Sequence, residues 1–278
     1  MLWIIATLSV LVTGCGSAGS NTAPTPSDPA IFASPVDDPS ADPMSEPAID
    51  GLFSIGAEGR LALRCWGRGA PVVVLEAGTD PTGGIGQFST TLGPELAART
   101  MTCTYDRLGA GLSDPAPHHR RTLDDLVVAL HRVLESAHVA GPYLLVGSSG
   151  GGAIAIHYAG TYPRQAAGLV LLDVSAPEPE LAEEFPEEAA DWDHGEFVDW
   201  YGMSAQLAYH RKPLPEIPVR IVTASDGQSS EEDQSFWLRL SPLATQQTLE
   251  GGHVIYSDDP EGVLAQIIEV LEQIELNA

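Results

Sequence analysis

The sequence is poor in positive charge. Its 278 residues include 13 Lys and Arg against 38 Asp and Glu, which gives a formal net charge of −25. Binding to nucleic acid or to anionic lipids depends on Lys and Arg contacts with phosphate, so a chain this acidic is a poor ligand for either. We therefore expect no nucleic-acid partner and no membrane contact through surface charge.

Cysteine is also scarce, and no Cys and His spacing typical of metal ligands is present. The chain has three Cys, at positions 15, 65 and 103. We expect no metal site and no cofactor, because structural and catalytic zinc sites need such clustered ligands. Cys65 and Cys103 each lie in a strand-like stretch. They could form a disulfide in an oxidising compartment, or remain two buried free thiols.

The apolar stretch at the N-terminus is too short to span a bilayer. It covers residues 1–13, whereas a spanning helix needs about 20. A short apolar run followed by small residues is typical of a signal peptide, and a Cys at this point resembles a bacterial lipobox. We predict a lipoprotein-type signal over residues 1–14, lipidation of Cys15, export, and anchoring at the cell surface or the periplasmic side of the membrane. The alternative is an ordinary cleaved signal and secretion.

The next segment, residues 15–48, consists mostly of Ser, Ala, Asp and Pro and cannot build a core. We interpret it as a disordered tether. The domain then extends over residues 49–278. The chain is 44% hydrophobic, which is enough for a sizeable core.

Strand-like and helical stretches alternate along this domain. The predicted strands are residues 52–55, 61–66, 72–75, 101–105, 143–146, 169–172, 219–223 and 246–249. The predicted helices are residues 85–99, 122–137, 150–161, 232–240 and 261–274. Continuous apolar strands are buried on both faces. The alternation therefore predicts an α/β fold with a mostly parallel sheet and helices on both faces.

The sharpest local signal is a Gly-x-Ser-x-Gly motif centred on Ser149. Gly147 and Gly151 complete it, a predicted strand precedes it, and a predicted helix follows. A sharp strand-to-helix turn forces the serine into a strained backbone, so small residues are needed two positions before and after it. The turn presents the hydroxyl at the positive end of the helix. We interpret Ser149 as a nucleophile; the alternative is a glycine-rich turn without chemistry.

A serine nucleophile needs a base. When the serine lies in a Gly-x-Ser-x-Gly turn between a strand and a helix, the catalytic residues follow along the chain in the order serine, acid, histidine. Only His194, His210 and His253 follow Ser149. His253 comes after two glycines, between the last predicted strand and the closing helix, where a loop side chain can reach over the sheet edge. His194 lies in an acidic segment and His210 beside Arg211, and both positions favour solvent. We assign the base to His253.

The acid of such a triad should follow a strand between Ser149 and His253. Asp226 and Asp173 both meet this condition. We expect Asp226 to be the acid, and Asp173 is the alternative because some proteins with this architecture place the acid there. The carboxylate would accept the Nδ1 proton of His253, fix its tautomer and stabilise the imidazolium.

An oxyanion hole needs two backbone N–H donors beside the nucleophile. One is the residue after it, Gly150, and the other comes from the turn after the first parallel strand. That turn covers residues 76–79, and we predict Thr79 as the donor, with Gly78 beside it.

From about residue 52 to the C-terminus the sequence resembles the α/β-hydrolase superfamily. The resemblance rests on residues 72–78, residues 105–114, the motif around Ser149, and residues 252–253 followed by 259–261. It implies an eight-stranded, mostly parallel sheet with a small cap segment at about residues 174–215. It also implies that Asp106 and Arg107 orient loops. In this family the strand that carries Cys65 lies beside the one that carries Cys103, which favours the disulfide.

The resemblance implies a serine hydrolase that cleaves a small carboxylic ester through an acyl-enzyme, without a cofactor. Ser149 argues against haloalkane dehalogenases and epoxide hydrolases, which use Asp as the nucleophile. The alternatives are another reaction of the same triad (peptidase, C–C hydrolase or cofactor-free perhydrolase) and an inactive binding lipoprotein. A purely structural surface protein is a third.

Asp and Glu residues are concentrated in the expected cap segment. Residues 174–200 include ten Asp and Glu and no Lys or Arg. We predict that the substrate is neutral or cationic and that the chain is a monomer, with the membrane contacted only through Cys15. The alternative for the acidic segment is a solvated face that keeps the protein soluble. Trp192, Phe197, Trp200 and Tyr201 could line an apolar pocket or anchor the cap to the core.

Overall fold

The computed structural model describes residues 46–79, 82–180, 195–210 and 212–277. The predicted signal peptide, Cys15 and nearly all of the predicted tether lie outside these residues, as does most of the acidic segment. None of the helices in the described stretches combines the length and the apolar composition that a membrane-spanning helix needs.

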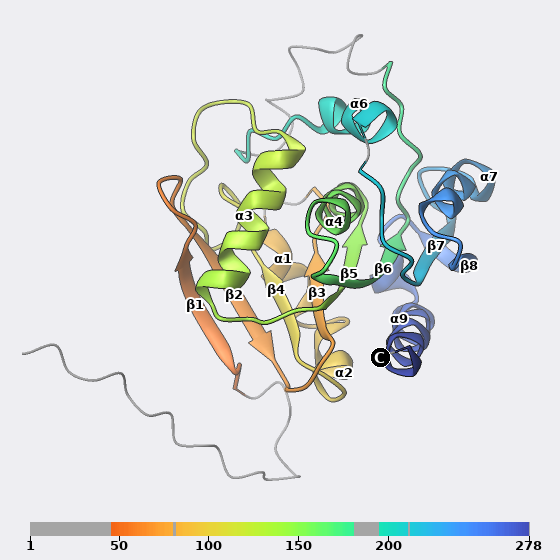
Figure 1. Cartoon of the computed structure of the whole chain (residues 1–278), viewed down its shortest axis with the longest axis horizontal. Helices are drawn as coiled ribbons and strands as arrows, with labels where there is room; N and C mark the ends of the chain where they lie inside the picture. The colour runs from red at the N-terminus through yellow and green to blue at the C-terminus, as the bar shows by residue number, and fades with distance from the viewer. Residues whose placement is uncertain (1–45, 80–81, 181–194, 211, 278) are drawn as a thin grey trace, which may run out of the picture. The chain divides into compact units, whose positions relative to one another are not determined.

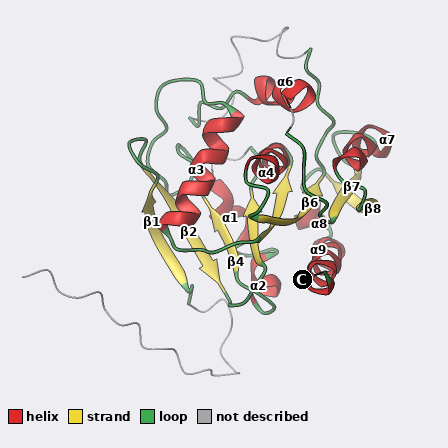
Figure 2. Cartoon of the chain, viewed as in Figure 1, coloured by secondary structure: helices red, strands yellow, loops and turns green. Residues whose placement is uncertain are grey.

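Eight strands of the described chain form one sheet in the order β1-β2-β4-β3-β5-β6-β7-β8 (Figures 1 and 2). The strands are β1 (Ile49–Ser54), β2 (Arg60–Trp66), β3 (Val72–Glu76), β4 (Thr102–Tyr105), β5 (Tyr143–Ser148), β6 (Ala166–Leu172), β7 (Val219–Asp226) and β8 (Ala244–Gly252). The β1–β2 and β2–β4 pairs are antiparallel, and the other pairs are parallel. The predicted eight-stranded, mostly parallel sheet is therefore confirmed.

Helices cover both faces of this sheet. They are α1 (Gly83–Phe88), α2 (Gly93–Ala97), α3 (Leu123–Ser136), α4 (Gly150–Thr161), α6 (Trp200–His210), α7 (Glu231–Gln234), the 3-10 helix η2 (Ser235–Leu240), α8 (Ile255–Asp258) and α9 (Pro260–Leu276). Residues of α3 and α4 belong to one hydrophobic cluster, and residues of α1, α2 and α9 belong to the other. Two layers of helices thus enclose the sheet.

The side chains of β3 show how the strands serve both layers. Val72 and Val74 pack in the α3–α4 cluster, while Val73 and Leu75 pack in the α9 cluster. Successive side chains of a strand point to opposite faces, so a strand buried on both sides must be apolar at every position. This explains the continuous apolar run in the sequence.

A disulfide joins Cys65 of β2 to Cys103 of β4. The two residues lie directly opposite each other in the antiparallel pair, with their Cα atoms 4.0 Å apart. Both side chains are fully buried. The predicted pairing is confirmed, and it cross-links the antiparallel edge of the sheet to the strand beside β3.

One helix prediction is wrong. The sequence predicts a single helix over residues 85–99, whereas the structure has the two short helices α1 and α2 with a turn between them. Pro94 stands in the first turn of α2, where its missing N–H costs nothing. In a continuous helix the same proline would remove a backbone hydrogen bond and clash with the preceding turn.

The described part of the expected cap is tied to the loop that precedes α3. The N–H of Arg121 donates to the carbonyl of Phe197 (2.7 Å), and the N–H of Asp199 donates to the carbonyl of Arg121 (2.9 Å). The Arg121 side chain also donates to the carbonyl of Glu196 (2.8 Å). Helix α6 begins directly after this anchored segment, so its first turn has a fixed place above the sheet.

Candidate active site

Ser149 occupies a sharp turn between β5 and α4, as its sequence motif predicts. Its backbone has φ 51° and ψ −128°, a conformation that L-residues rarely adopt. The flanking glycines are required by close approach. A Cβ on Gly147 would lie 2.6 Å from the Gly151 carbonyl oxygen, and one on Gly151 would lie 2.5 Å from the carbonyl oxygen of Ala77. Any larger residue at either position would displace the turn.

His253 connects Ser149 to an aspartate. It lies in the loop after β8, with Nε2 2.9 Å from Ser149 Oγ and Nδ1 2.6 Å from Asp173 Oδ2. A serine hydroxyl, an imidazole and a carboxylate therefore form one hydrogen-bonded chain. With a proton on Nδ1, the imidazole donates to the carboxylate and its Nε2 accepts from the serine.

The prediction that Asp226 is the partner of His253 is wrong, and the alternative, Asp173, holds that position. Asp226 is the exposed last residue of β7. Asp173 follows β6, the immediate neighbour of β5, and the register pairs Ser148 with Leu172. Asp173 therefore emerges beside Ser149, one strand closer than Asp226.

Asp173 is completely buried, and its carboxylate is surrounded by donors. Gln234 Nε2 donates to Oδ1 (2.6 Å), and the backbone N–H groups of Ala224 and Gln228 lie 3.3 and 3.2 Å from the two oxygens. Gly227 leaves the necessary space, because a Cβ there would lie 2.4 Å from Oδ1. Burial raises the pKa of Asp173, but the hydrogen bonds from His253, Gln234 and the backbone outweigh it and keep the pKa below its usual value. The carboxylate is therefore ionised at neutral pH.

The three residues predicted to form the oxyanion hole all border the same cavity as Ser149. Gly78, Thr79 and Gly150 line it together with His253. Gly78 is so close that a Cβ there would lie 3.2 Å from Ser149 Cβ. The structure thus brings the turn after β3 next to Ser149, while the identity of the two N–H donors stays a prediction.

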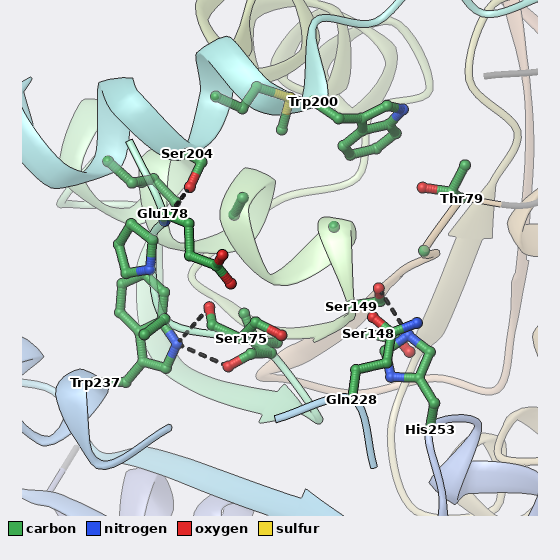
Figure 3. A pocket seen from close by; sticks show the side chains of 18 of the residues that line it. Thr79, Ser148, Ser149, Ser175, Glu178, Trp200, Ser204, Gln228, Trp237 and His253 are labelled. Atoms are coloured by element: carbon green, nitrogen blue, oxygen red, sulfur yellow. Dashed lines mark hydrogen bonds between the residues drawn. The ribbon is translucent and has the colours of Figure 1, made fainter. Parts of the chain in front are cut away.

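The cavity has a volume of about 580 Å³. Most of its wall is apolar or aromatic, and Figure 3 shows Trp200 and Trp237 on different sides of it. Trp200 and Tyr201 of α6 line the cavity, which agrees with the prediction that these aromatic residues form an apolar pocket. Phe197 packs against His118 instead, and Trp192 lies outside the described residues. The sequence does not predict Trp237 as a lining residue, because nothing in it relates the short 3-10 helix η2 to Ser149, which lies 88 residues earlier.

Among the described residues that line the cavity, Glu178 is the one that carries a carboxylate. Glu178 is exposed, and Figure 3 shows its side chain pointing into the cavity toward the side of Ser149. No Lys or Arg belongs to the described cavity wall. In the same described part of the chain, no three His, Cys, Asp or Glu side chains are grouped closely enough to hold a metal ion.

Comparison with known proteins agrees with this geometry. The family model described as "alpha/beta hydrolase fold" matches residues 70–256. The "Putative carbamate hydrolase RutD" of Cronobacter turicensis is 30% identical over 105 residues, which is 38% of this chain and 38% of that protein. The match thus spans well under half the length of that relative.

Solved structures share the fold over most of the chain. The enol-lactonase from Burkholderia xenovorans superposes with a TM-score of 0.62 at 14% identity, covering 79% of this chain and 99% of that one. A thermophilic esterase from Thermogutta terrifontis superposes with a TM-score of 0.60 at 20% identity, covering 82% and 99%. The family match covers more than half of the chain and includes the Ser149 turn and His253, so the chain belongs to the α/β-hydrolase fold family.

Proposed function

We propose that this α/β hydrolase is a serine hydrolase that cleaves a small carboxylic ester through an acyl-enzyme. The observation that carries the proposal is the chain of hydrogen bonds from Ser149 Oγ through His253 to the buried Asp173. It lies at the wall of a cavity large enough for a small-molecule ligand.

The reaction follows from this geometry in two halves. His253 Nε2 takes the proton of Ser149 as Oγ attacks the ester carbonyl carbon, and the negative oxygen is held by the N–H groups of Gly150 and Thr79. The tetrahedral intermediate collapses, the alcohol leaves with the proton from Nε2, and the acyl group stays on Ser149. Nε2 then takes a proton from water as the water oxygen attacks the acyl carbon, and it returns this proton to Ser149 Oγ as the Oγ–acyl bond breaks and the acid leaves. Asp173 stabilises the imidazolium in both halves.

A fluorophosphonate probe tests the proposal without knowledge of the substrate. Such a reagent phosphonylates a serine only when a base and oxyanion donors activate it. We expect one adduct per chain, located on Ser149 by peptide mass spectrometry. Heat-denatured protein is the control and should remain unlabelled. Folded protein without an adduct would refute the serine hydrolase proposal.

Two acids of the acidic segment are not available to attract a substrate. Glu196 is buried and ion-paired with Arg107 (2.6 Å), and Asp199 is ion-paired with Arg120 (2.5 Å). Glu178 is different, because its exposed carboxylate points into a cavity that is also lined by Trp200 and Trp237, and no Lys or Arg belongs to the described cavity wall. We therefore propose that Glu178 contributes the preference for neutral or cationic esters, since a carboxylate with aromatic rings favours an ammonium group and disfavours an anion.

This preference predicts a specific response to Glu178→Gln. The matched substrates are the 4-nitrophenyl esters of 4-(trimethylammonio)butyric acid and of 5,5-dimethylhexanoic acid, which have the same shape and differ in charge. We expect the ratio of kcat/KM for the cationic over the neutral ester to fall by about 2- to 5-fold, as for a single exposed charge pair. The steady-state rates with both esters check it.

The control variant is Glu180→Gln, which removes an exposed acid two residues away that does not belong to the described cavity wall. It should leave the ratio unchanged. If Glu178→Gln also leaves the ratio unchanged, Glu178 has no role in substrate choice.

A further inference from the structure

Arg107, which follows β4, makes an unusually complete set of hydrogen bonds. Its guanidinium is buried, and Nε, Nη1 and Nη2 all donate. Nη1 donates to Glu76 Oε1 (2.9 Å) and to the carbonyl of Ala77 (2.7 Å). Nη2 donates to the carbonyl of Gly78 (2.8 Å), and Nε and Nη2 donate to the two oxygens of Glu196 (2.6 and 3.0 Å). The Arg107 side chain therefore holds the turn after β3 through hydrogen bonds to two of its carbonyl groups.

Arg107 donates to the carbonyl oxygens of two peptide groups, Ala77–Gly78 and Gly78–Thr79. The N–H groups of these two peptides are expected to face the oxyanion. The carbonyl of Gly78 and the N–H of Thr79 belong to one planar trans peptide, so they point in opposite directions. Fixing the Gly78 oxygen on Arg107 therefore also fixes the direction of the Thr79 N–H. The same holds for the Ala77 oxygen and the Gly78 N–H. A cation at the carbonyl end also polarises the amide and strengthens its N–H as a donor.

Arg107 is itself held by two carboxylates. Glu76 ends β3 and also accepts a hydrogen bond from Tyr105 (2.5 Å), while Glu196 comes from the cap segment before α6. Burial raises the pKa of Glu76 to about 7, although Arg107 and Tyr105 oppose the rise. Glu196 is the bidentate partner, and a bidentate carboxylate fixes the plane of a guanidinium as well as its position.

The cap reaches the other half of the oxyanion hole as well. The ring of Trp200, at the start of α6, lies against Gly150 so closely that a Cβ on Gly150 would lie 2.4 Å from it. The same ring is 5.5 Å from the Arg107 guanidinium carbon. Residues 196–200 therefore reach one expected donor segment directly, at Gly150, and the other indirectly, because Glu196 binds the Arg107 side chain that holds the Ala77 and Gly78 carbonyls.

We propose that Arg107 is a positioning residue that orients the Gly78–Thr79 peptide toward the oxyanion, and that Glu196 of the cap holds Arg107 in place for this role. The inference rests on the serine hydrolase function proposed above. It makes the cap a structural part of the oxyanion hole rather than only a wall of the substrate cavity.

The test compares Arg107→Lys and Glu196→Gln with the wild type, using 4-nitrophenyl acetate as the substrate and phenylboronic acid as the inhibitor. Boronic acid forms a tetrahedral adduct on the serine, so its affinity reports the oxyanion hole directly. Losing one oxyanion donor costs about 10²–10³ in rate, and misorienting one should cost less. We expect kcat to fall about 10- to 100-fold in Arg107→Lys, because an ammonium cannot make the planar, forked contacts of a guanidinium. The inhibition constant should rise by a similar factor while KM changes less than about threefold.

Glu196→Gln keeps Arg107 and one oxygen acceptor, so it still tests the idea if Arg107→Lys fails to fold. It should show the same pattern with a smaller loss, about 3- to 10-fold in kcat. The control is Arg60→Lys, which alters the ion pair between the exposed Arg60 of β2 and Asp114, neither of which belongs to the described cavity wall. It should leave kcat and the inhibition constant unchanged.

The two proposals fail in different ways. If the wild type takes up the fluorophosphonate probe but both folded variants keep its kcat and boronic acid affinity, the role of Arg107 and Glu196 is refuted and the hydrolase remains. If kcat falls while the boronic acid affinity is unchanged, the residues act elsewhere and the inference is again overturned. If the wild type takes up no probe, the serine hydrolase function itself is refuted, and the inference with it.

Discussion

Asp173→Asn should lower kcat by about 10⁴-fold for any ester that the protein hydrolyses, with the fold retained. The asparagine amide fills the same space but can donate to His253 Nδ1, which leaves the imidazole in the wrong tautomer to accept the Ser149 proton. The normal carboxylate is ionised at neutral pH because its hydrogen bonds lower its pKa. Steady-state kinetics with 4-nitrophenyl acetate, together with a thermal melt to confirm folding, measure the effect.

The matched control is Asp226→Asn, which makes the same substitution on the neighbouring strand. Asp226 is exposed at the end of β7, and His253 bonds instead to Asp173. We expect its kcat to stay within about twofold of the wild type, as for a surface change away from the reacting groups. A large loss in Asp226→Asn with a small one in Asp173→Asn would return the triad acid to β7 and contradict the geometry.

Ser149→Ala should lower kcat by about 10⁶-fold, to the level that binding and the oxyanion donors alone provide. The acyl-enzyme cannot form without Oγ, so the pre-steady-state burst of 4-nitrophenol should also disappear. Stopped-flow measurement of the burst at rising ester concentrations checks this result, because a loss of substrate binding alone would be overcome at high concentration.

Ser148→Ala is the control for this second experiment. Ser148 is the last residue of β5, is buried, and borders the same cavity, so it tests whether the adjacent hydroxyl can replace Ser149. We expect the burst to persist and kcat to change by less than about fivefold, because His253 faces Ser149 and not Ser148. Equal activity of the two alanine variants would contradict the assignment of the nucleophile.

The position of Ser149 could be predicted from sequence because its causes are local. The strained turn needs glycine at 147 and 151, and both glycines are visible in the chain. The acid could not be chosen in the same way. Asp173 and Asp226 both end parallel strands, and what separates them is the place of β6 beside β5 and the register of Ser148 with Leu172. Neither the strand order nor this register can be inferred from the sequences of the two segments that contain Asp173 and Asp226.

The ion pairs of the acidic segment, residues 174–200, could not be predicted from the sequence either. In the sequence its acids form one run, but Glu196 is buried against Arg107, 89 residues earlier, and Asp199 is paired with Arg120. Taken from the sequence alone, a run of acids predicts a solvated face. The basic residues that pair with some of these acids lie far away in the chain, so the sequence does not reveal the pairing. The fold class was predictable because alternating apolar stretches report burial directly, whereas ion pairs across the fold depend on tertiary contacts.

The disulfide between Cys65 and Cys103 has a topological consequence for the intact molecule. The chain between the two cysteines contains β3, the turn at Gly78 and Thr79, α1 and α2, so this turn belongs to a closed covalent ring. A single protease cut anywhere within that ring opens it without dividing the molecule. The two pieces remain joined through sulfur, and a nicked sample migrates as one species on a denaturing gel until a reductant separates them.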